Sequence, residues 1–160
     1  MTVAVPSDLR PVEVAYKTSL RVRALLFWLP LLIGSFITDR LLLAETGWGG
    51  LAPSLVVLFA FAGAVYAPGR VYRRLGYALD DRLLRVVRGW MFHTDTVVPF
   101  VKVQHIDVTR GPIDKLFDLA SLVVHTAGTH NSVVTLPGLS PETATSIRDA
   151  IRAEIRADAE

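Results

Sequence analysis

The sequence contains no cysteine, and this absence excludes several classes of protein. Without cysteine the chain cannot be a disulfide-stapled secreted domain, and it has no thiolate zinc site, iron–sulfur cluster or cysteine nucleophile. The net charge is also small, +2 at pH 7, while 51% of the 160 residues are hydrophobic. Disordered chains have few apolar residues and a high net charge, so that class is excluded as well. The length suits one ordinary domain, or a membrane anchor with one small domain.

Charged residues are missing from two long stretches, 24–38 and 46–69. The first stretch alone is too short to cross about 30 Å of hydrocarbon at 1.5 Å per residue, but apolar residues resume at once, so a helix over 22–44 is long enough. The second stretch predicts a helix over 51–67, and it lacks the polar face of a soluble helix. Buried helices of a soluble domain and a cleaved signal peptide are the weighed alternatives. About twenty residues precede the first stretch and no cleavage-like site follows it, so we predict two transmembrane helices.

A glycine-rich turn over 45–50 joins the two helices and predicts a tight hairpin with both chain ends on one side of the membrane. Lysine and arginine favour the cytoplasmic side, and they flank the hairpin at both ends, while the turn and its edge carry only Arg40. We therefore expect a multi-pass protein of the cell membrane with cytoplasmic termini. Close helix packing needs small side chains, and the candidates are Gly34, Gly63 and Ala64.

From Arg70 onward, patterns of period two replace the long apolar runs. Short strands are predicted over 76–79, 82–92, 96–110 (two strands broken at Pro99), 120–128 and 132–136, where Pro137-Gly138 stops the last one. Ser140-Pro141-Glu142 predicts the start of a helix that runs to about Ala157, with a basic stripe at Arg148, Arg152 and Arg156. The pattern predicts six or seven antiparallel strands, curled into a small barrel or sandwich whose open end a helix covers.

The run 97–128 resembles the signature of YdbS-like bacterial membrane proteins, which carry a bacterial pleckstrin-homology (PH) domain after two transmembrane helices. The matching features are Pro99 followed by Gln104 in a strand, the short leucine-rich helix over 115–119, and the Thr-x-Gly-like turn over 126–128. The resemblance implies a curved barrel of about seven strands capped by a C-terminal α-helix, with no catalytic residues. It also implies a larger, YdbT-like membrane partner with several such domains. Asp118 stands where many relatives would have glycine.

The resulting organisation has three parts: an N-terminal cytoplasmic segment over 1–21, a transmembrane hairpin over 22–69 and a cytoplasmic PH-like domain over 70–160. No metal or cofactor site is predicted, because the four histidines (His93, His105, His125 and His130) lack ligand spacing. The nearest candidate pair is His105 and Asp107, on one face of a strand. No serine has the context of a nucleophile and no glycine-rich loop suits a phosphate, so we expect a protein that is not an enzyme.

Six arginines make up the most informative charged feature. They are candidates for contact with lipid headgroups, or simple topology signals: Arg70, Arg73, Arg74, Arg82, Arg85 and Arg88. Asp39 and Arg40 lie near the other interface, where they are either solvated or a functional pair that faces a partner helix. Beyond Arg88 acidic residues outnumber basic ones, so a nucleic-acid partner is not expected.

These observations favour a non-enzymatic, membrane-anchored PH-like scaffold or adaptor that binds a membrane protein, or a second copy of itself, and anionic lipid. The alternative function is an accessory subunit of a membrane export or antimicrobial-resistance system, in which the hairpin contributes to a transport path. Intramembrane charge would favour that alternative, and only Asp39 and Arg40 hint at it.

Overall fold

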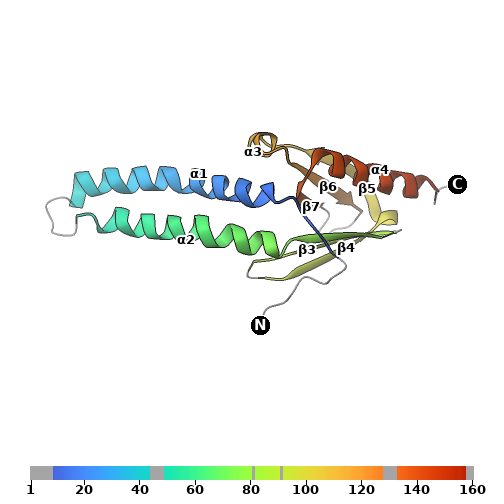
Figure 1. The fold of residues 1–160 in the computed structure, drawn as a ribbon, viewed down its shortest axis with the longest axis horizontal. Helices are drawn as coiled ribbons and strands as arrows, with labels where there is room; N and C mark the ends of the chain where they lie inside the picture. The colour runs from blue at the N-terminus through green and yellow to red at the C-terminus, as the bar shows by residue number, and fades with distance from the viewer. Residues whose placement is uncertain (1–8, 44–48, 81, 91, 128–132, 158–160) are drawn as a thin grey trace.

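The computed structural model describes residues 9–43, 49–80, 82–90, 92–127 and 133–157. A hairpin of two long helices projects from a β unit (Figure 1). Helix α1 (Ala15–Thr38) continues into one π-helical turn, η1 (Asp39–Leu43), and helix α2 (Leu51–Arg73) returns beside it. Both predicted helices are confirmed, although α1 begins seven residues earlier than expected and α2 continues past residue 67. The expected turn over 45–50 lies mostly outside the described residues.

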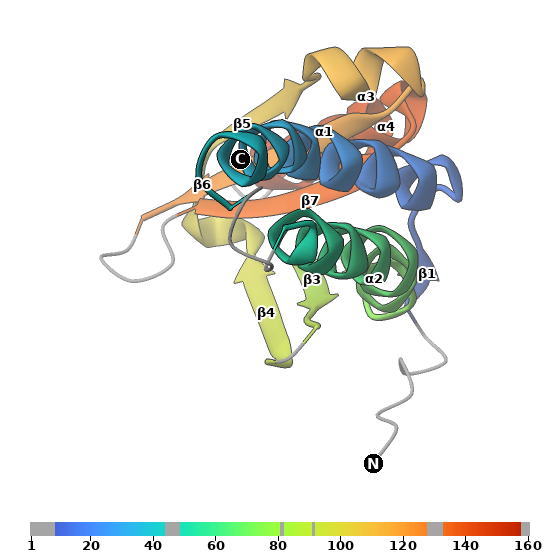
Figure 2. The same cartoon turned by 90° about the vertical axis from the view of Figure 1, so that its left-hand side faces the viewer.

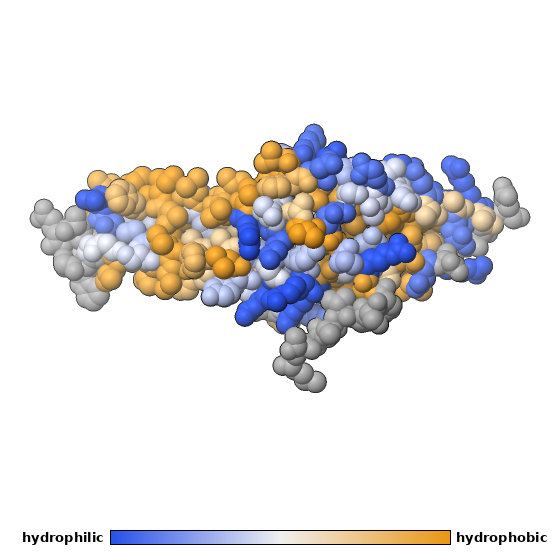
Figure 3. Space-filling model, viewed as in Figure 1, coloured by the Kyte–Doolittle hydropathy of each residue, from blue (hydrophilic) through white to orange (hydrophobic). Residues whose placement is uncertain are grey.

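Apolar side chains cover most of the face of the hairpin that Figure 3 shows. Phe27 and Phe61 are each 64% exposed, and Leu41 is 77% exposed. No residue is buried in the most apolar 18-residue stretch of α1. A continuous apolar surface of this size is stable only in contact with lipid or other apolar helices, so its exposure supports the prediction of two membrane spans.

The β unit consists of two antiparallel sheets. The first sheet has the order β1-β2-β3-β4, made of Arg10–Pro11, Gly76–Asp80, Leu83–Arg88 and Thr94–Pro99. The second sheet has the order β5-β6-β7, made of Val103–Thr109, Ala120–Thr126 and Val133–Leu139. Pro99 ends β4, and the short 3₁₀ helix η2 (Phe100–Lys102) leads into β5, so the predicted break at this proline separates the two sheets.

Two helices complete the unit. Helix α3 (Pro112–Leu116) links β5 to β6, and helix α4 (Pro141–Ala157) follows β7. The backbone N–H of Thr143 donates a 3.1 Å hydrogen bond to Oγ of Ser140, which confirms the predicted N-cap of α4. Within the described residues, seven strands in two sheets and a C-terminal helix form the PH-like architecture expected from the sequence.

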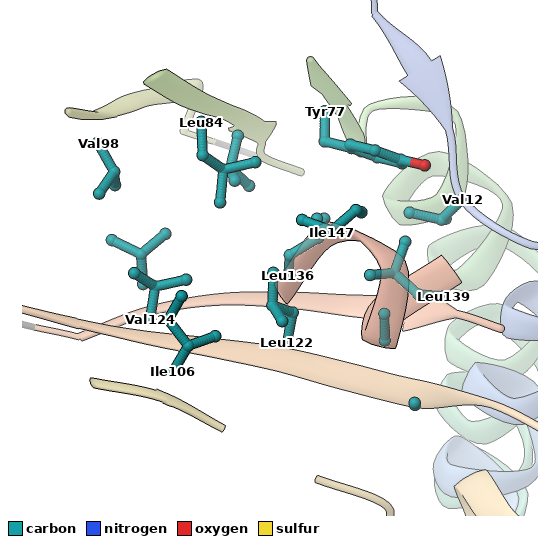
Figure 4. Close-up of a cluster of buried hydrophobic side chains, with 14 of the residues drawn as sticks. Val12, Tyr77, Leu84, Val98, Ile106, Leu122, Val124, Leu136, Leu139 and Ile147 are labelled. Atoms are coloured by element: carbon teal, nitrogen blue, oxygen red, sulfur yellow. The ribbon is translucent and has the colours of Figure 1, made fainter. Parts of the chain in front are cut away.

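The core lies between the two sheets and α4 (Figure 4). Leu84 of the first sheet and Leu122 and Leu136 of the second are fully buried, and α4 contributes Ile147 and Ile151. Burying a side chain of this size contributes about 1.5–3 kcal/mol. The alternation that predicted the strands places these residues on the inward face of each sheet.

Residues before the hairpin also belong to this core. Strand β1 pairs with β2, and Val12 and Tyr16 are 4% and 6% exposed within the main cluster. Leu9 covers Ala78 and Val87 on the outer face of the first sheet. Along the sequence, the hairpin therefore lies between β1 and β2. The core of the β unit contains residues that precede the hairpin as well as residues that follow it.

The prediction that Pro137-Gly138 ends the last strand is wrong. Strand β7 continues to Leu139, and its register with β6 shifts by one residue across this pair. Strand β7 pairs only with β6 in the described structure, so an edge position accommodates the missing N–H of Pro137. Gly138 adopts a φ of +78°, and its carbonyl accepts a 2.8 Å hydrogen bond from the backbone N–H of Glu13. Residues 128–132, where the predicted strands over 120–128 and 132–136 meet, lie outside the described residues.

Candidate functional site

The end of the β unit that faces the hairpin collects most of the predicted lipid-contact arginines. Arg70 and Arg73 lie on the last turns of α2, and Nε of Arg73 donates a 3.3 Å hydrogen bond to the carbonyl of Gly69. Arg74 follows the helix and donates a 2.6 Å hydrogen bond to the carbonyl of Trp90 in the β3–β4 turn. This bond fastens the turn to the end of the second span.

Arg88 joins this group at the end of β3. It lines a cavity of about 370 Å³ together with Val71 and Leu75 from the end of α2, and with Trp90 and Tyr16. The cavity lies where both helices enter the β unit. Arg70, Arg73, Arg74 and Arg88 therefore lie at the same end of the domain, beside the membrane spans.

The structure places the other two arginines differently. Arg85 forms a two-pronged ion pair with Asp95 on β4, with Nε–Oδ1 and Nη2–Oδ2 distances of 3.0 and 2.5 Å. The hydrogen bond from Arg85 lowers the pKa of Asp95, so the carboxylate stays charged and balances the guanidinium at neutral pH. Arg82 precedes β3 at its opposite end, about 20 Å along the strand from Arg88. The six arginines thus do not form one surface.

An ion pair joins α1 to α3 on the other side of the same junction. Nη2 of Arg23 donates a 2.6 Å hydrogen bond to Oδ1 of Asp114, whose side chain is 10% exposed. The other oxygen of Asp114 accepts a 3.2 Å hydrogen bond from the backbone N–H of Gly111 and so caps the short helix. This contact could not be predicted from the sequence, because 91 residues separate the partners and nothing in the local pattern pairs them.

Asp118, the residue that stands in place of a common glycine, has a φ of +51°. Aspartate tolerates this left-handed region better than most residues with a Cβ. Its side chain forms a 2.8 Å ion pair with Arg110, and Arg110 also donates to the carbonyl of Leu119. The turn after α3 therefore has the backbone conformation that glycine would favour.

The two spans pack closely around Gly63. A Cβ added at Gly63 would lie 3.0 Å from Nε1 of Trp28 on α1, and the neighbouring Ala60 and Ala64 are buried. Gly34 is different, because an added Cβ there would meet no atom within 4 Å. Within the hairpin, close approach thus occurs at Gly63 and Ala64, whereas Gly34 faces open space.

Replacing Gly63 with leucine is expected to destabilise the hairpin by about 1–3 kcal/mol, because the larger side chain must displace Trp28. The matched variant Gly34→Leu should leave stability nearly unchanged. Thermal unfolding of the full chain in detergent micelles, followed by tryptophan fluorescence, measures both. Equal losses in the two variants would contradict this packing.

The far end of the hairpin contains Asp39 and Arg40. Oδ1 of Asp39 accepts a 2.7 Å hydrogen bond from the backbone N–H of Gly50, directly before α2. A carboxylate at this position also interacts favourably with the N-terminal end of the helix dipole. The guanidinium carbon of Arg40 lies 5.1 Å from the centre of the Phe36 ring. These contacts are internal to the hairpin. The hydrogen bond between Gly50 and Asp39 joins the end of the first helix to the start of α2.

Two histidines and one carboxylate meet on the outer face of the second sheet. Nε2 of His105 lies 2.8 Å from Oδ1 of Asp107, and Nε2 of His125 lies 3.6 Å from Oδ2. His125 joins the sequence-predicted pair because it is the cross-strand partner of His105. Among the residues that the structure describes, no three acidic, histidine or cysteine side chains are arranged to hold a metal ion. His93 is exposed, and His130 lies outside the described residues.

A groove of about 270 Å³ lies between β5 and α4. Its helix wall belongs to the C-terminal part of α4, which lies at the end of the domain away from the hairpin (Figure 1). Gln104 and His105 form its strand side, and Arg152, Ile155 and Arg156 form its helix side. In the described structure β5 pairs only with β6, so it is an edge strand. The sequence shows the basic stripe of α4, but it does not reveal which strand the stripe lies beside.

The β unit and the two apolar helices together define a membrane-anchored protein with a PH-like domain, and a comparison with known families supports this class. Residues 24–155 match the family model described as Bacterial PH domain, which covers most of the chain, so the chain belongs to this family. It is a membrane protein in which a PH domain adjoins two apolar helices.

Similarity to a known protein narrows this class of membrane proteins further. The chain is 35% identical over 75 residues to the UPF0699 transmembrane protein YdbS of Bacillus subtilis (strain 168). The match covers 47% of this chain and 45% of that protein, so it spans about half the length of the relative. The expected YdbS-like membrane protein with a bacterial PH domain is thereby confirmed. No solved structure matches the chain.

Proposed function

We propose that this protein is a non-enzymatic scaffold of the cell membrane that holds a membrane-protein partner through its PH domain. The groove between β5 and α4 is the observation that carries the proposal. It lies at the end of the domain farthest from the spans, where a cytoplasmic segment of another membrane protein can reach it (Figure 1). The partner is a larger protein with related domains, of the YdbT-like kind that the family resemblance implies.

The groove suits an extended segment that carries acidic side chains. An edge strand offers unpaired backbone N–H and C=O groups, to which an added strand can hydrogen-bond. Helix α4 forms the opposite wall, with Ile155 for apolar contact and Arg152 and Arg156 for charge. Complementary charge speeds association and rejects basic competitors, so the two arginines select for an acidic segment.

The orientation in the proposal rests on the arginines beside the spans. Arg70, Arg73, Arg74 and Arg88 lie together at the junction, and basic residues there favour the cytoplasmic side. Anionic headgroups attract such residues by about 1 kcal/mol each near the surface, so this end of the domain faces anionic lipid. The PH domain and both chain termini are then cytoplasmic.

Photo-crosslinking from the groove tests the scaffold role. A genetically encoded photoreactive residue replaces Gln104, which is exposed on the groove wall, in the full chain within native membranes. We expect one prominent crosslinked membrane protein, identified by mass spectrometry, whose yield falls about tenfold with Arg152→Glu, the effect of losing roughly 1.4 kcal/mol of binding. Arg148→Glu is the matched control, because Arg148 lies on the same helix outside the groove and contacts Asp149.

Two outcomes would overturn the scaffold proposal. One is the absence of a crosslinked membrane protein while the variant still inserts and folds. The other is an equal yield with Arg152→Glu and Arg148→Glu, since a groove that binds an acidic segment must respond to the first change alone.

A further inference from the structure

Two exposed apolar tips lie on opposite sides of the hairpin, at the end of the β unit that faces it. One tip is the β3–β4 turn, where Trp90 is 47% exposed and Phe92 is 79% exposed. The other is α3, where Leu116 is 75% exposed. Viewed along the hairpin, α3 lies on the α1 side and β4 begins on the α2 side (Figure 2). The two tips therefore straddle the membrane spans.

The α3 tip lies at the depth where the first span begins. The ion pair between Arg23 and Asp114 fixes α3 against α1 at a distance of 2.6 Å. Arg23 is the last charged residue before the charge-free stretch 24–38. A charged residue that directly precedes an apolar span marks the boundary of the hydrocarbon, so α3 lies beside that boundary.

The β3–β4 tip lies at a matching depth beside the second span. The 2.6 Å hydrogen bond from Arg74 to the carbonyl of Trp90 fixes the turn at the end of α2. Arg74 is four residues beyond Arg70, where the charge-free stretch ends, which corresponds to about 6 Å along a helix. The headgroup layer is about 5–8 Å thick on each side of the hydrocarbon, so the turn lies within it.

We propose that the β3–β4 turn and α3 insert Trp90, Phe92 and Leu116 into the headgroup layer on the two sides of the hairpin. Tryptophan is enriched at this depth because its ring is apolar and its N–H is polar. Arg74 and Arg88 beside the turn are placed to meet lipid phosphates. Two contacts on opposite sides of a narrow hairpin prevent the PH domain from tilting about it, so the distal groove is presented at a fixed height.

Tryptophan fluorescence tests the depth of the turn directly. The chain has three tryptophans, Trp28, Trp48 and Trp90, so W28F/W48F leaves Trp90 as the only one. The full-length variant is reconstituted in phosphatidylcholine vesicles containing lipids with a quencher at the headgroup or deep in the acyl chain. We expect emission at short wavelength, strong quenching by the headgroup label and weaker quenching by the deep label.

Matched variants complete the test. Val101 is as exposed as the tips, at 77%, but lies in η2 at the distal end of the domain. With all three native tryptophans replaced by phenylalanine, L116W should be quenched like Trp90, whereas V101W should not be quenched. Circular dichroism confirms that each variant is folded.

Quenching of Trp90 or L116W no greater than that of V101W overturns the two-sided contact. Loss of the contact at only one tip overturns it equally, because a single tip does not prevent tilting. The partner groove lies at the other end of the domain, so this result and the photo-crosslinking result can fail independently.

Discussion

Replacing Gly138 with alanine is expected to destabilise the PH domain by about 2–5 kcal/mol. The backbone contributes one part of this cost, because a φ of +78° is left-handed and disfavours a residue with a Cβ by about 1–2 kcal/mol. Packing contributes the other part. The added Cβ would lie 2.6 Å from Cγ and 2.9 Å from Cβ of Tyr16, and overpacking of this kind costs about 1–3 kcal/mol. Tyr16 cannot swing aside, because the nearest atoms are close to its own backbone.

Chemical unfolding of the full chain in micelles measures this loss, with Gly50→Ala as the control. Gly50 has a similar φ of +85°, but an added Cβ there would meet nothing within 4 Å. The control should lose only the backbone part, about 1–2 kcal/mol. Equal losses in the two variants would mean that the close approach of Tyr16 on α1 to Gly138 on β7 does not add to the cost of a side chain at position 138.

Replacing Asp114 with asparagine should cost about 1.5–3 kcal/mol, because two partners then lose a charged acceptor. Arg23 keeps its charge beside a largely buried site, where its Nε already lacks a hydrogen-bond partner. Breaking a fully buried pair costs more, but the Arg23 side chain is 40% exposed and solvent screens part of the effect. The backbone N–H of Gly111 loses its carboxylate cap in the same variant.

Asp118→Asn provides a chemically identical control in the turn that follows α3. Asp118 is 77% exposed in its ion pair with Arg110, so the change should cost less than about 1 kcal/mol. Hydrogen exchange across residues 112–116 should rise only in Asp114→Asn, because that variant releases α3 from α1. A comparable rise in both variants would show that the Arg23 pair does not hold the short helix.

The spans and most strands could be predicted because their signals are local. A stretch without charge indicates a spanning helix, and period-two alternation indicates a half-buried strand. Strand β1 has only two residues, Arg10 and Pro11, and no alternation can be read from two residues. The end of α2 could not be predicted either, since Pro68 and Arg70 are typical of a helix end but the helix continues to Arg73.

The sequence did not show which of the predicted lipid-contact arginines lie together. Arg82, Arg85 and Arg88 are spaced by three residues, and a strand with period two turns Arg85 to the face opposite the other two. Its pairing with Asp95 depends on the register of β3 and β4, which the sequence does not specify. Because strand register and tertiary packing are not specified locally, the sequence also did not show that His125 lies across from His105 or that α4 lies beside β5.

The position of the hairpin between β1 and β2 couples membrane insertion to domain folding. The core needs Val12 and Tyr16 from before the spans as well as strands synthesised after them, so it closes only when both parts reach the same compartment. A chain whose second helix failed to cross would leave these two parts on opposite sides of the bilayer, and its core would stay open. Assembly of the PH-domain core therefore depends on both helices of the hairpin being inserted, because residues that precede the hairpin and strands that follow it must meet.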